Sequence, residues 1–357
     1  MPLTDMPLEQ LREYRPEVPE PPDFDAFWAR TLKETRSHPL GARWTPLAFD
    51  EHQMTAFQVY DVRFNGWAGE PVAAWLLLPR ASGDQEGLLP AVVQYLGYTG
   101  GRGLPVEHVF FPSAGYAHLV VDSRGQGTDT PDPDGAAAGT QWAGGFLTRG
   151  IEDPHDHYYR RLTADCVRAV EALREHPAVD PRRITVAGAS QGGGLALAVA
   201  GLAPELVAGA LVDVPFLCHF RRAARTALQS PYTELADYLR LHHRGAEERV
   251  FGTLDYFDGL HHAARATAPA LFSAALMDPV CPASTVFAAY HRYAGPARMQ
   301  AWEFGDHGGG YADQVRLQFA WLREQGLAPL APPARPAPGA PAEGPADGPP
   351  EGPGFGS

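Results

Sequence analysis

One short segment constrains the fold more than any other, because it joins a strand to a helix through a serine. The pentapeptide Gly188-Ala189-Ser190-Gln191-Gly192 follows an apolar strand expected at 184–187 and opens an apolar helix expected at 190–202. Its glycines leave room where side chains would collide with the neighbouring strand and helix, and the turn strains the serine main chain. This pattern is typical of the nucleophile elbow of a serine hydrolase, and the helix N-terminus adds partial positive charge beside Ser190. The plainer interpretation is a glycine-rich turn without catalytic function.

The apolar segments elsewhere in the chain predict an α/β fold. Two segments, 56–64 and 72–78, have the pattern of an antiparallel pair that begins a sheet. The other expected strands are 91–96, 117–121, 184–187, 207–212, 270–276 and 299–304, and the expected helices are 24–36, 161–176, 190–202, 284–294 and 313–324. Continuous apolar strands that alternate with helices indicate a mostly parallel, twisted sheet with helices on both faces. Together with the elbow, this pattern predicts the α/β-hydrolase fold.

The chain is expected to form one α/β-hydrolase domain over residues 1–330. The segment 218–268 has helical patterns but no strand, and we interpret it as a helical insertion over the active site. It would lie at the carboxyl edge of the sheet, where such folds bind their ligands. Residues 331–357 contain nine proline, six glycine and six alanine residues, a composition that cannot bury a core. We therefore expect this tail to be disordered.

Charge and apolar content exclude several classes of partner. The formal net charge is -13 and no run of Lys and Arg stands out, which argues against nucleic acid and anionic membranes. The start of the chain has no pattern of a secretory signal, and no stretch approaches the roughly 18 apolar residues of a membrane span. A cytoplasmic protein is therefore expected. Cys166, Cys218 and Cys281 are scattered without metal-site or disulfide spacing, and we interpret them as buried thiols.

A serine hydroxyl needs a base to act as a nucleophile, and in this fold the acid and the histidine follow the serine in that order. Asp278 stands where a late strand gives way to a loop. His307 lies in a glycine-rich loop after the last strand, where it can be aimed at Ser190. Asp213, at the end of an earlier strand, and Asp306, next to the histidine, are the alternatives for the acid.

Two main-chain N–H groups are needed to stabilise the oxyanion of an acyl transfer. One is expected from Gln191, the residue after the nucleophile. The other is expected from Tyr95 or its neighbour, because a strand runs there into the glycine-rich segment 97–101. The alternative interpretation of that segment is an ordinary flexible loop.

The histidines raise the question of a metal site. None of them has the helical i, i+4 spacing with a carboxylate that is typical of catalytic zinc. The pairs considered are His155/His157, His242/His243 and His261/His262. We interpret them as solvated or packed side chains, and neither a metal nor an organic cofactor is expected.

With these residues in place, the chain resembles carbohydrate esterase family 7, the acetyl xylan esterases and cephalosporin C deacetylases. The resemblance runs from about residue 5 to 326 and depends on Arg124-Gly125-Gln126, on Gly188 to Gly193 and on His307. The segments 213–222 and 277–282 also look like family stretches. One departure is Gly308, where the family has a glutamate after the histidine, so the rigidity of this loop is in question.

The resemblance implies a triad of Ser190, Asp278 and His307 and oxyanion donors at the main chain of Tyr95 and Gln191. It also implies a homo-hexamer and a small acetylated substrate, either a sugar such as a xylo-oligosaccharide or an antibiotic ester such as cephalosporin C.

Arg124 is expected to be structural, because a guanidinium can tie several loop carbonyls together beneath the site, although direct substrate contact is an alternative. The expected activity is that of a serine esterase that removes acetyl groups through an acetyl-enzyme. The alternatives are an α/β-hydrolase peptidase, a general short-chain carboxylesterase and an inactive binding protein on a hydrolase fold.

Overall fold

A nine-stranded sheet forms the centre of the molecule. The computed structural model describes residues 3–80, 87–133 and 145–329, so the predicted tail at 331–357 lies outside the described residues. In sequence order the strands are β1 Arg43–Pro46, β2 Phe57–Asn65, β3 Pro71–Pro79, β4 Leu89–Tyr95, β5 Ala117–Val121, β6 Val179–Ala189, β7 Gly209–Asp213, β8 Ala270–Ala275 and β9 Ala297–Trp302. Their order across the sheet is β1-β2-β3-β5-β4-β6-β7-β8-β9.

The sheet has an antiparallel edge and a parallel centre. β1, β2, β3 and β5 pair antiparallel in turn, and every pairing from β5 through β4 to β9 is parallel. The prediction of a mostly parallel sheet that begins with an antiparallel pair is therefore confirmed. The parallel order sets the carboxyl ends of β4, β6, β7 and β8 side by side at one edge of the sheet.

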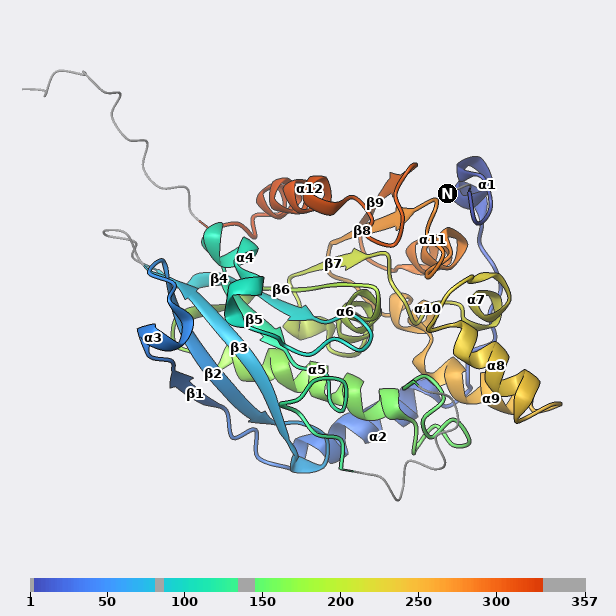
Figure 1. Cartoon of the computed structure of the whole chain (residues 1–357), viewed down its shortest axis with the longest axis horizontal. Coiled ribbons are helices and arrows are strands. Elements are labelled where there is room, and N and C mark those ends of the chain that lie inside the picture. Colours follow the sequence, from blue (N-terminus) through green and yellow to red (C-terminus); the bar gives the residue numbers. More distant parts are fainter. Residues whose placement is uncertain (1–2, 81–86, 134–144, 330–357) are drawn as a thin grey trace, which may run out of the picture.

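Helices cover both faces of this sheet. The α-helices are α1 Leu8–Glu13, α2 Phe24–Arg36, α3 Phe49–His52, α4 Phe110–Ser113, α5 Tyr158–Arg174, α6 Gln191–Leu202, α7 Phe220–Thr226, α8 Thr233–Leu241, α9 Glu247–Leu254, α10 Gly259–Ala263, α11 Ala283–Arg292 and α12 Tyr311–Glu324. Figure 1 shows α12 and α4 on one side of the strands and α2 and α5 on the other. The alternation of side chains along β4 follows this arrangement. Val93 lies in the large core with α5 and α6, and Val92 lies in a smaller core with Phe111 and Trp321 of α4 and α12.

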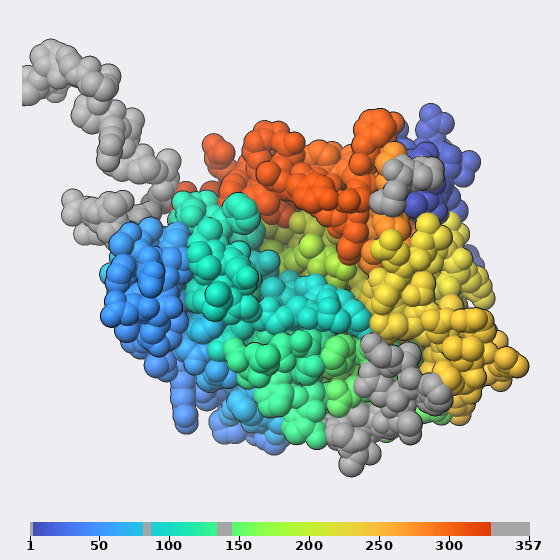
Figure 2. Space-filling view, viewed as in Figure 1, coloured from blue at the N-terminus to red at the C-terminus, as the bar shows by residue number. Residues whose placement is uncertain are grey.

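The helices of the 218–268 segment gather at one end of the molecule. Figure 1 shows α7, α8 and α9 beyond the ends toward which the central strands point, and Figure 2 shows their yellow surface opposite the blue N-terminal strands. No described residue of this segment lies in a strand. Among the described residues, no helix has the length and apolar character needed to cross a membrane.

Candidate active site

Ser190 occupies a sharp turn between β6 and α6. Its φ of 56° and ψ of -121° are unfavourable for a residue with a side chain, so the turn is strained. Hydrogen bonds on both sides hold it: the Ser190 N–H donates to the Asp213 carbonyl at 3.0 Å, and the Ser190 carbonyl accepts from the Phe216 N–H at 2.9 Å. The main chain is therefore fixed by the neighbouring strand and loop, and the hydroxyl stands at the start of a helix.

Both glycines of the pentapeptide are required by close packing. A Cβ atom at position 188 would lie 2.2 Å from the main-chain carbon of Gly192, and one at position 192 would lie 2.1 Å from the carbonyl oxygen of Tyr95. Contacts this short to main-chain atoms cannot be relieved by a side-chain rotation. The steric constraint that the sequence predicts at both glycines is therefore present in the structure.

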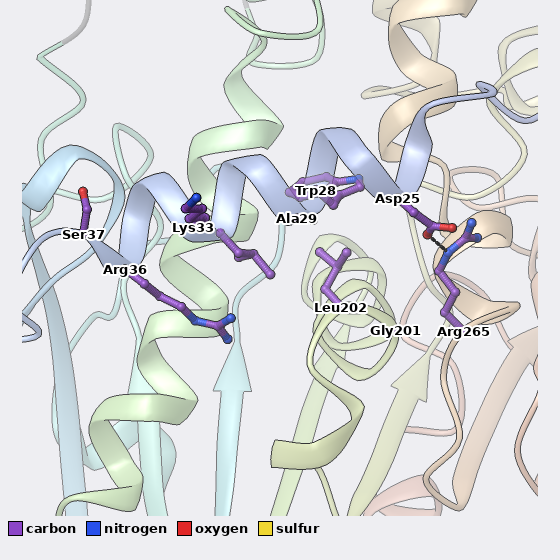
Figure 3. A pocket seen from close by; sticks show the side chains of 10 residues that line it. Asp25, Trp28, Ala29, Lys33, Arg36, Ser37, Gly201, Leu202 and Arg265 are labelled. Atoms are coloured by element: carbon purple, nitrogen blue, oxygen red, sulfur yellow. Dashed lines mark hydrogen bonds and ion pairs between the residues drawn. The ribbon is translucent and has the colours of Figure 1, made fainter.

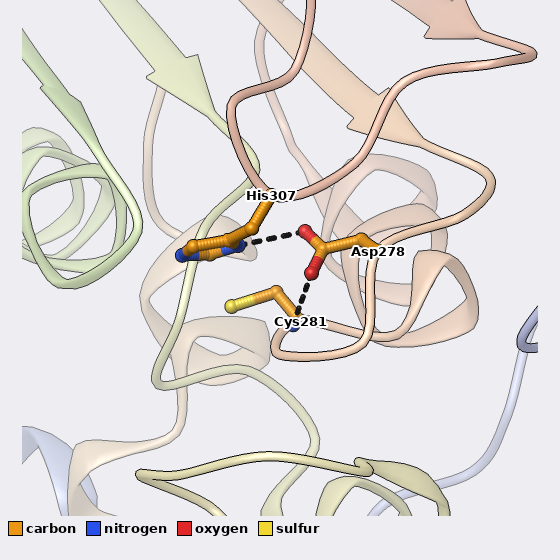
Figure 4. A group of neighbouring side chains, drawn as sticks. All are labelled: Asp278, Cys281 and His307. Carbon is orange, nitrogen blue, oxygen red and sulfur yellow. Dashed lines mark hydrogen bonds and ion pairs between the residues drawn. The ribbon is translucent and has the colours of Figure 1, made fainter. Parts of the chain in front are cut away.

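Asp278 and His307 form a close pair. His307 Nδ1 lies 2.8 Å from Asp278 Oδ2, and the carboxylate is fully buried whereas the imidazole is 30% exposed. The other carboxylate oxygen accepts from the N–H groups of Val280 and Cys281 at 2.8 and 2.9 Å. With Nδ1 donating to the carboxylate, Nε2 is left as the basic nitrogen. Figure 4 shows the two side chains facing each other across the two loops.

Ser190 and His307 open into one cavity. It measures about 560 Å³ and reaches from the segment after β4 to the 218–268 helices. Its lining residues are Gln94, Tyr95, Leu96, Gly97, Tyr98, Thr99, Ala189, Ser190, Ser230, Pro231, Glu234, Val280 and His307. The cavity therefore brings together residues that are more than 200 positions apart in the sequence, at the carboxyl edge of the sheet.

The two alternative acids have other partners. Asp213 is half-buried, and its carboxylate accepts hydrogen bonds from Ser273 and from Gln314 and Gln318 of α12. Burial raises the pKa of Asp213 to about 6, against the effect of these donors. Asp306 accepts from the Gly308 N–H at 2.9 Å and from the Tyr311 hydroxyl at 2.6 Å. Neither carboxylate forms a hydrogen bond with His307 within the described ranges.

Gln126 connects the residue after the nucleophile to the segment after β4. Its side-chain oxygen accepts from the Thr99 N–H at 2.7 Å, and its amide nitrogen donates to Gln191 Oε1 at 2.8 Å. Gln191 in turn donates to the Leu96 carbonyl at 3.2 Å. The neighbouring Gly125 has a φ of 69°, a left-handed conformation that favours glycine. This network fixes the two segments expected to supply the oxyanion donors.

Arg124 has carboxylate partners. Its guanidinium is fully buried and donates to both oxygens of Asp165 at 2.6 and 2.9 Å. It also donates to Glu70 at 2.7 Å and to Asp132 at 3.3 Å. The sequence predicts main-chain carbonyls of loops as the partners of Arg124. The structure shows carboxylates instead, and they come from three separate segments. These ion pairs engage the guanidinium of Arg124 within the domain. Arg124 is not among the described residues that line the cavity.

Cys281 lies beside the Asp278–His307 pair. Burial raises the pKa of its thiol well above the ordinary value, Asp278 raises it further, and a hydrogen bond with Ser190 acts the other way. The thiol is therefore neutral near pH 7. Asp278, Cys281 and His307 each offer a ligand atom within 4.8 Å of the others, so these are the described residues best placed to hold a metal ion. The carboxylate oxygen nearest the imidazole is already engaged by it, however.

A larger cavity of about 720 Å³ lies away from these residues. Figure 3 shows it between α2 and the end of α6, with Trp28, Lys33, Arg36 and Arg265 around it. Arg265 forms an ion pair there with Asp25 at 2.5 Å. The described residues around it include no nucleophile with a neighbouring base, so the smaller cavity at Ser190 and His307 is the candidate active site.

The fold and this site place the protein in the class of α/β-hydrolase-fold serine hydrolases. More specifically, the chain belongs to the acetyl xylan esterase (AXE1) family, whose sequence model matches residues 1–325. It is therefore a carboxylic ester hydrolase. The family and the fold that the sequence predicts are therefore confirmed.

Two solved structures are closely similar. The acetyl xylan esterase of Paenibacillus sp. R4 is 38% identical with a TM-score of 0.83, and the match covers 90% of this chain and 100% of that chain. Acetyl xylan esterase 1 of Thermoanaerobacterium sp. JW/SL YS485 is 32% identical with a TM-score of 0.82, covering 90% and 99%. The acetyl esterase Axe7A of Xylanibacter ruminicola is 26% identical over 318 residues, which is 87% of this chain and 69% of that protein.

Proposed function

We propose that Ser190, His307 and Asp278 act together as the catalytic triad of this acetyl-removing esterase. The hydrogen bond between the buried Asp278 carboxylate and His307 Nδ1 is the observation that carries the proposal. His307 Nε2 takes the proton of the Ser190 hydroxyl as its oxygen attacks the ester carbonyl carbon, and then gives this proton to the departing alcohol oxygen. Water, activated by the same nitrogen, attacks the acetyl-serine, and acetate leaves. The chemistry needs no cofactor.

The oxyanion of each tetrahedral intermediate is stabilised by main-chain N–H groups. Gln191 is the first residue of α6, so its N–H has no acceptor within the helix. The second donor belongs to residues 95–98, which comprise the last residue of β4 and the three residues after it. Tyr95, the residue expected from the sequence, ends the strand, and the N–H of Tyr98 has no acceptor among the described residues. Gln126 supports both segments and acts as a positioning residue.

The cargo is a short acyl group, and this gives the test of the proposed function. The chain belongs to the acetyl xylan esterase family, and the cavity wall mixes apolar side chains such as Leu96 with the polar Thr99 and Ser230. Each buried methylene stabilises binding by about 0.8 kcal/mol only on apolar surface. We expect kcat/KM for p-nitrophenyl acetate to exceed that for the octanoate by about 100-fold or more. Comparable values on both esters, with the butanoate as an intermediate control, would indicate a general or lipase-like esterase instead.

A second expected result concerns metals. Because proton transfer between Ser190 and His307 needs none, dialysis against a chelator should leave kcat/KM for p-nitrophenyl acetate unchanged. Added Zn²⁺ should not increase it. Loss of activity on chelation, restored by Zn²⁺ alone, would show that the group of Asp278, Cys281 and His307 holds a functional ion.

The substrate of this chain is proposed to be a small acetylated carbohydrate. The family carries this proposal, and the peptidase alternative and the inactive binding protein are correspondingly disfavoured. Four further expectations from the sequence stay predictions. They are an antibiotic ester as substrate, a cap formed by residues 218–268, a homo-hexamer and a cytoplasmic location. Light scattering of the purified protein tests the hexamer directly.

A further inference from the structure

Glu234 has an unusual position in the wall of the active-site cavity. It lies in the first turn of α8, within the helical segment 218–268, and among the described residues that line the cavity it is the single carboxylate. The proposed mechanism does not use it, since Asp278 already pairs with His307. A carboxylate that lines this cavity without a part in the proposed chemistry needs another explanation.

The Glu234 carboxylate is held in place by two hydroxyl groups. Tyr98 donates to Oε2 at 3.0 Å, and Ser230 donates to Oε1 at 3.2 Å. The Tyr98 oxygen itself accepts from the N–H groups of Phe146 and Leu147. With both acceptor positions of that oxygen occupied, its proton can point only to Glu234. The carboxylate therefore has a fixed orientation before any substrate arrives.

No Lys or Arg within the described ranges forms an ion pair with Glu234. Its hydrogen-bond partners are the hydroxyl groups of Tyr98 and Ser230 and the main chain of Leu147, and these neutral groups do not cancel its negative charge. Burial raises the pKa of this carboxyl above its ordinary value, and the hydrogen bonds from Tyr98, Ser230 and the main chain of Leu147 oppose that shift. An ionised carboxylate has about four acceptor positions, so it can accept a further hydrogen bond besides these three.

We propose that Glu234 forms a subsite for the alcohol half of the ester, where it accepts hydrogen bonds from neutral hydroxyl groups and repels anionic alcohols. This inference rests on the proposed function, because it assumes that Ser190 is acylated in the same cavity. The methyl of an acetyl group has no hydrogen-bond donor for a carboxylate. The hydroxyl groups of the alcohol half do, so we assign Glu234 to the alcohol half. A polyol presents the donors that a carboxylate needs, and each bond to a charged acceptor is stronger than one between neutral groups.

The subsite predicts discrimination between two sugars that differ in one group. Acetylated methyl glucoside carries a CH₂OH where acetylated methyl glucuronoside carries a carboxylate. The native protein should show a kcat/KM for the glucoside at least about tenfold higher, which corresponds to about 1.4 kcal/mol. A ratio near one in the native protein would overturn the proposal without any variant.

The variant Glu234→Gln keeps the shape and removes the charge. We expect it to lower the ratio of kcat/KM for the glucoside to kcat/KM for the glucuronoside by about tenfold. A purely structural role of Glu234 would not change this ratio, since a distorted cavity would reduce kcat/KM for both sugars together. The matched control is Asp237→Asn, which removes one negative charge from the exposed face of the same helix, where Asp237 pairs with Arg240. The ratio should not change in the control. Equal loss on both sugars in Glu234→Gln, or an equal shift in the control, would refute the subsite.

Failure of this proposal differs from failure of the proposed function. If the native protein hydrolyses p-nitrophenyl acetate through Ser190 but does not discriminate between the sugars, only the role of Glu234 is wrong. If p-nitrophenyl acetate is not hydrolysed, or is hydrolysed without Ser190, the proposed function itself is wrong.

Discussion

Replacement of Ser190 by alanine is expected to lower kcat for acetyl esters by about 10⁴-fold or more. The change removes the oxygen that forms the acetyl-enzyme, so no covalent route remains, and the oxyanion donors alone give only residual catalysis. Folding should be preserved, because the hydrogen bonds that fix this turn use the main chain of Ser190 with Asp213 and Phe216. Steady-state kinetics with p-nitrophenyl acetate and a thermal melt measure both effects.

A labelling experiment separates loss of the nucleophile from loss of structure. An organophosphate should modify the native protein at Ser190 and should not modify Ser190→Ala. Ser113→Ala is a matched control, because this exposed serine of α4 lies outside the cavity, and it should keep both kcat and labelling. More than a few per cent of native activity in a pure sample of Ser190→Ala would contradict the assignment of the nucleophile.

Much of the fold could be predicted because the central strands carry their own signal. Runs such as Ala117–Val121 are buried on both faces, so nearly every residue in them is apolar. The edge strand Arg43–Pro46 was not predicted, since it is short, mostly exposed and has no apolar run. The start of β6 at Val179 was also missed. Asp180 and Pro181 interrupt the pattern there, and only pairing with β4 makes the segment a strand.

Some residues of the candidate site also have a local sequence signal, and others do not. Ser190 and His307 could be found because each follows a strand within a glycine-rich turn, a local signal that the sequence contains. Glu234 could not be found, since a helical glutamate is ordinarily solvated, and its approach to Tyr98 depends on how α8 packs against the segment after β4. The partners of Arg124 were missed for the same reason. They come from three segments that only the folded sheet brings together.

Asp278→Asn should produce the other large effect, a loss of about 10³- to 10⁴-fold in kcat. In the native protein Asp278 Oδ1 accepts from two main-chain N–H groups and Oδ2 faces His307 Nδ1. The asparagine oxygen must keep the position of Oδ1, because an amide nitrogen cannot accept those hydrogen bonds. Its NH₂ group then faces Nδ1 and forces this nitrogen to be the acceptor. Nε2 becomes protonated and cannot take the proton of Ser190.

Asp213→Asn tests whether this loss is specific to the pair with His307. It makes the same chemical change to a half-buried carboxylate near the elbow, but that carboxylate accepts hydrogen bonds from Ser273 and from two glutamines of α12. Its expected cost in kcat is below about tenfold, since no tautomer depends on it. Kinetics on both variants at one pH, with thermal melts to exclude unfolding, decide the matter. A larger loss in Asp213→Asn than in Asp278→Asn would move the catalytic acid to the end of β7, because only the group that fixes the imidazole proton can have the dominant effect.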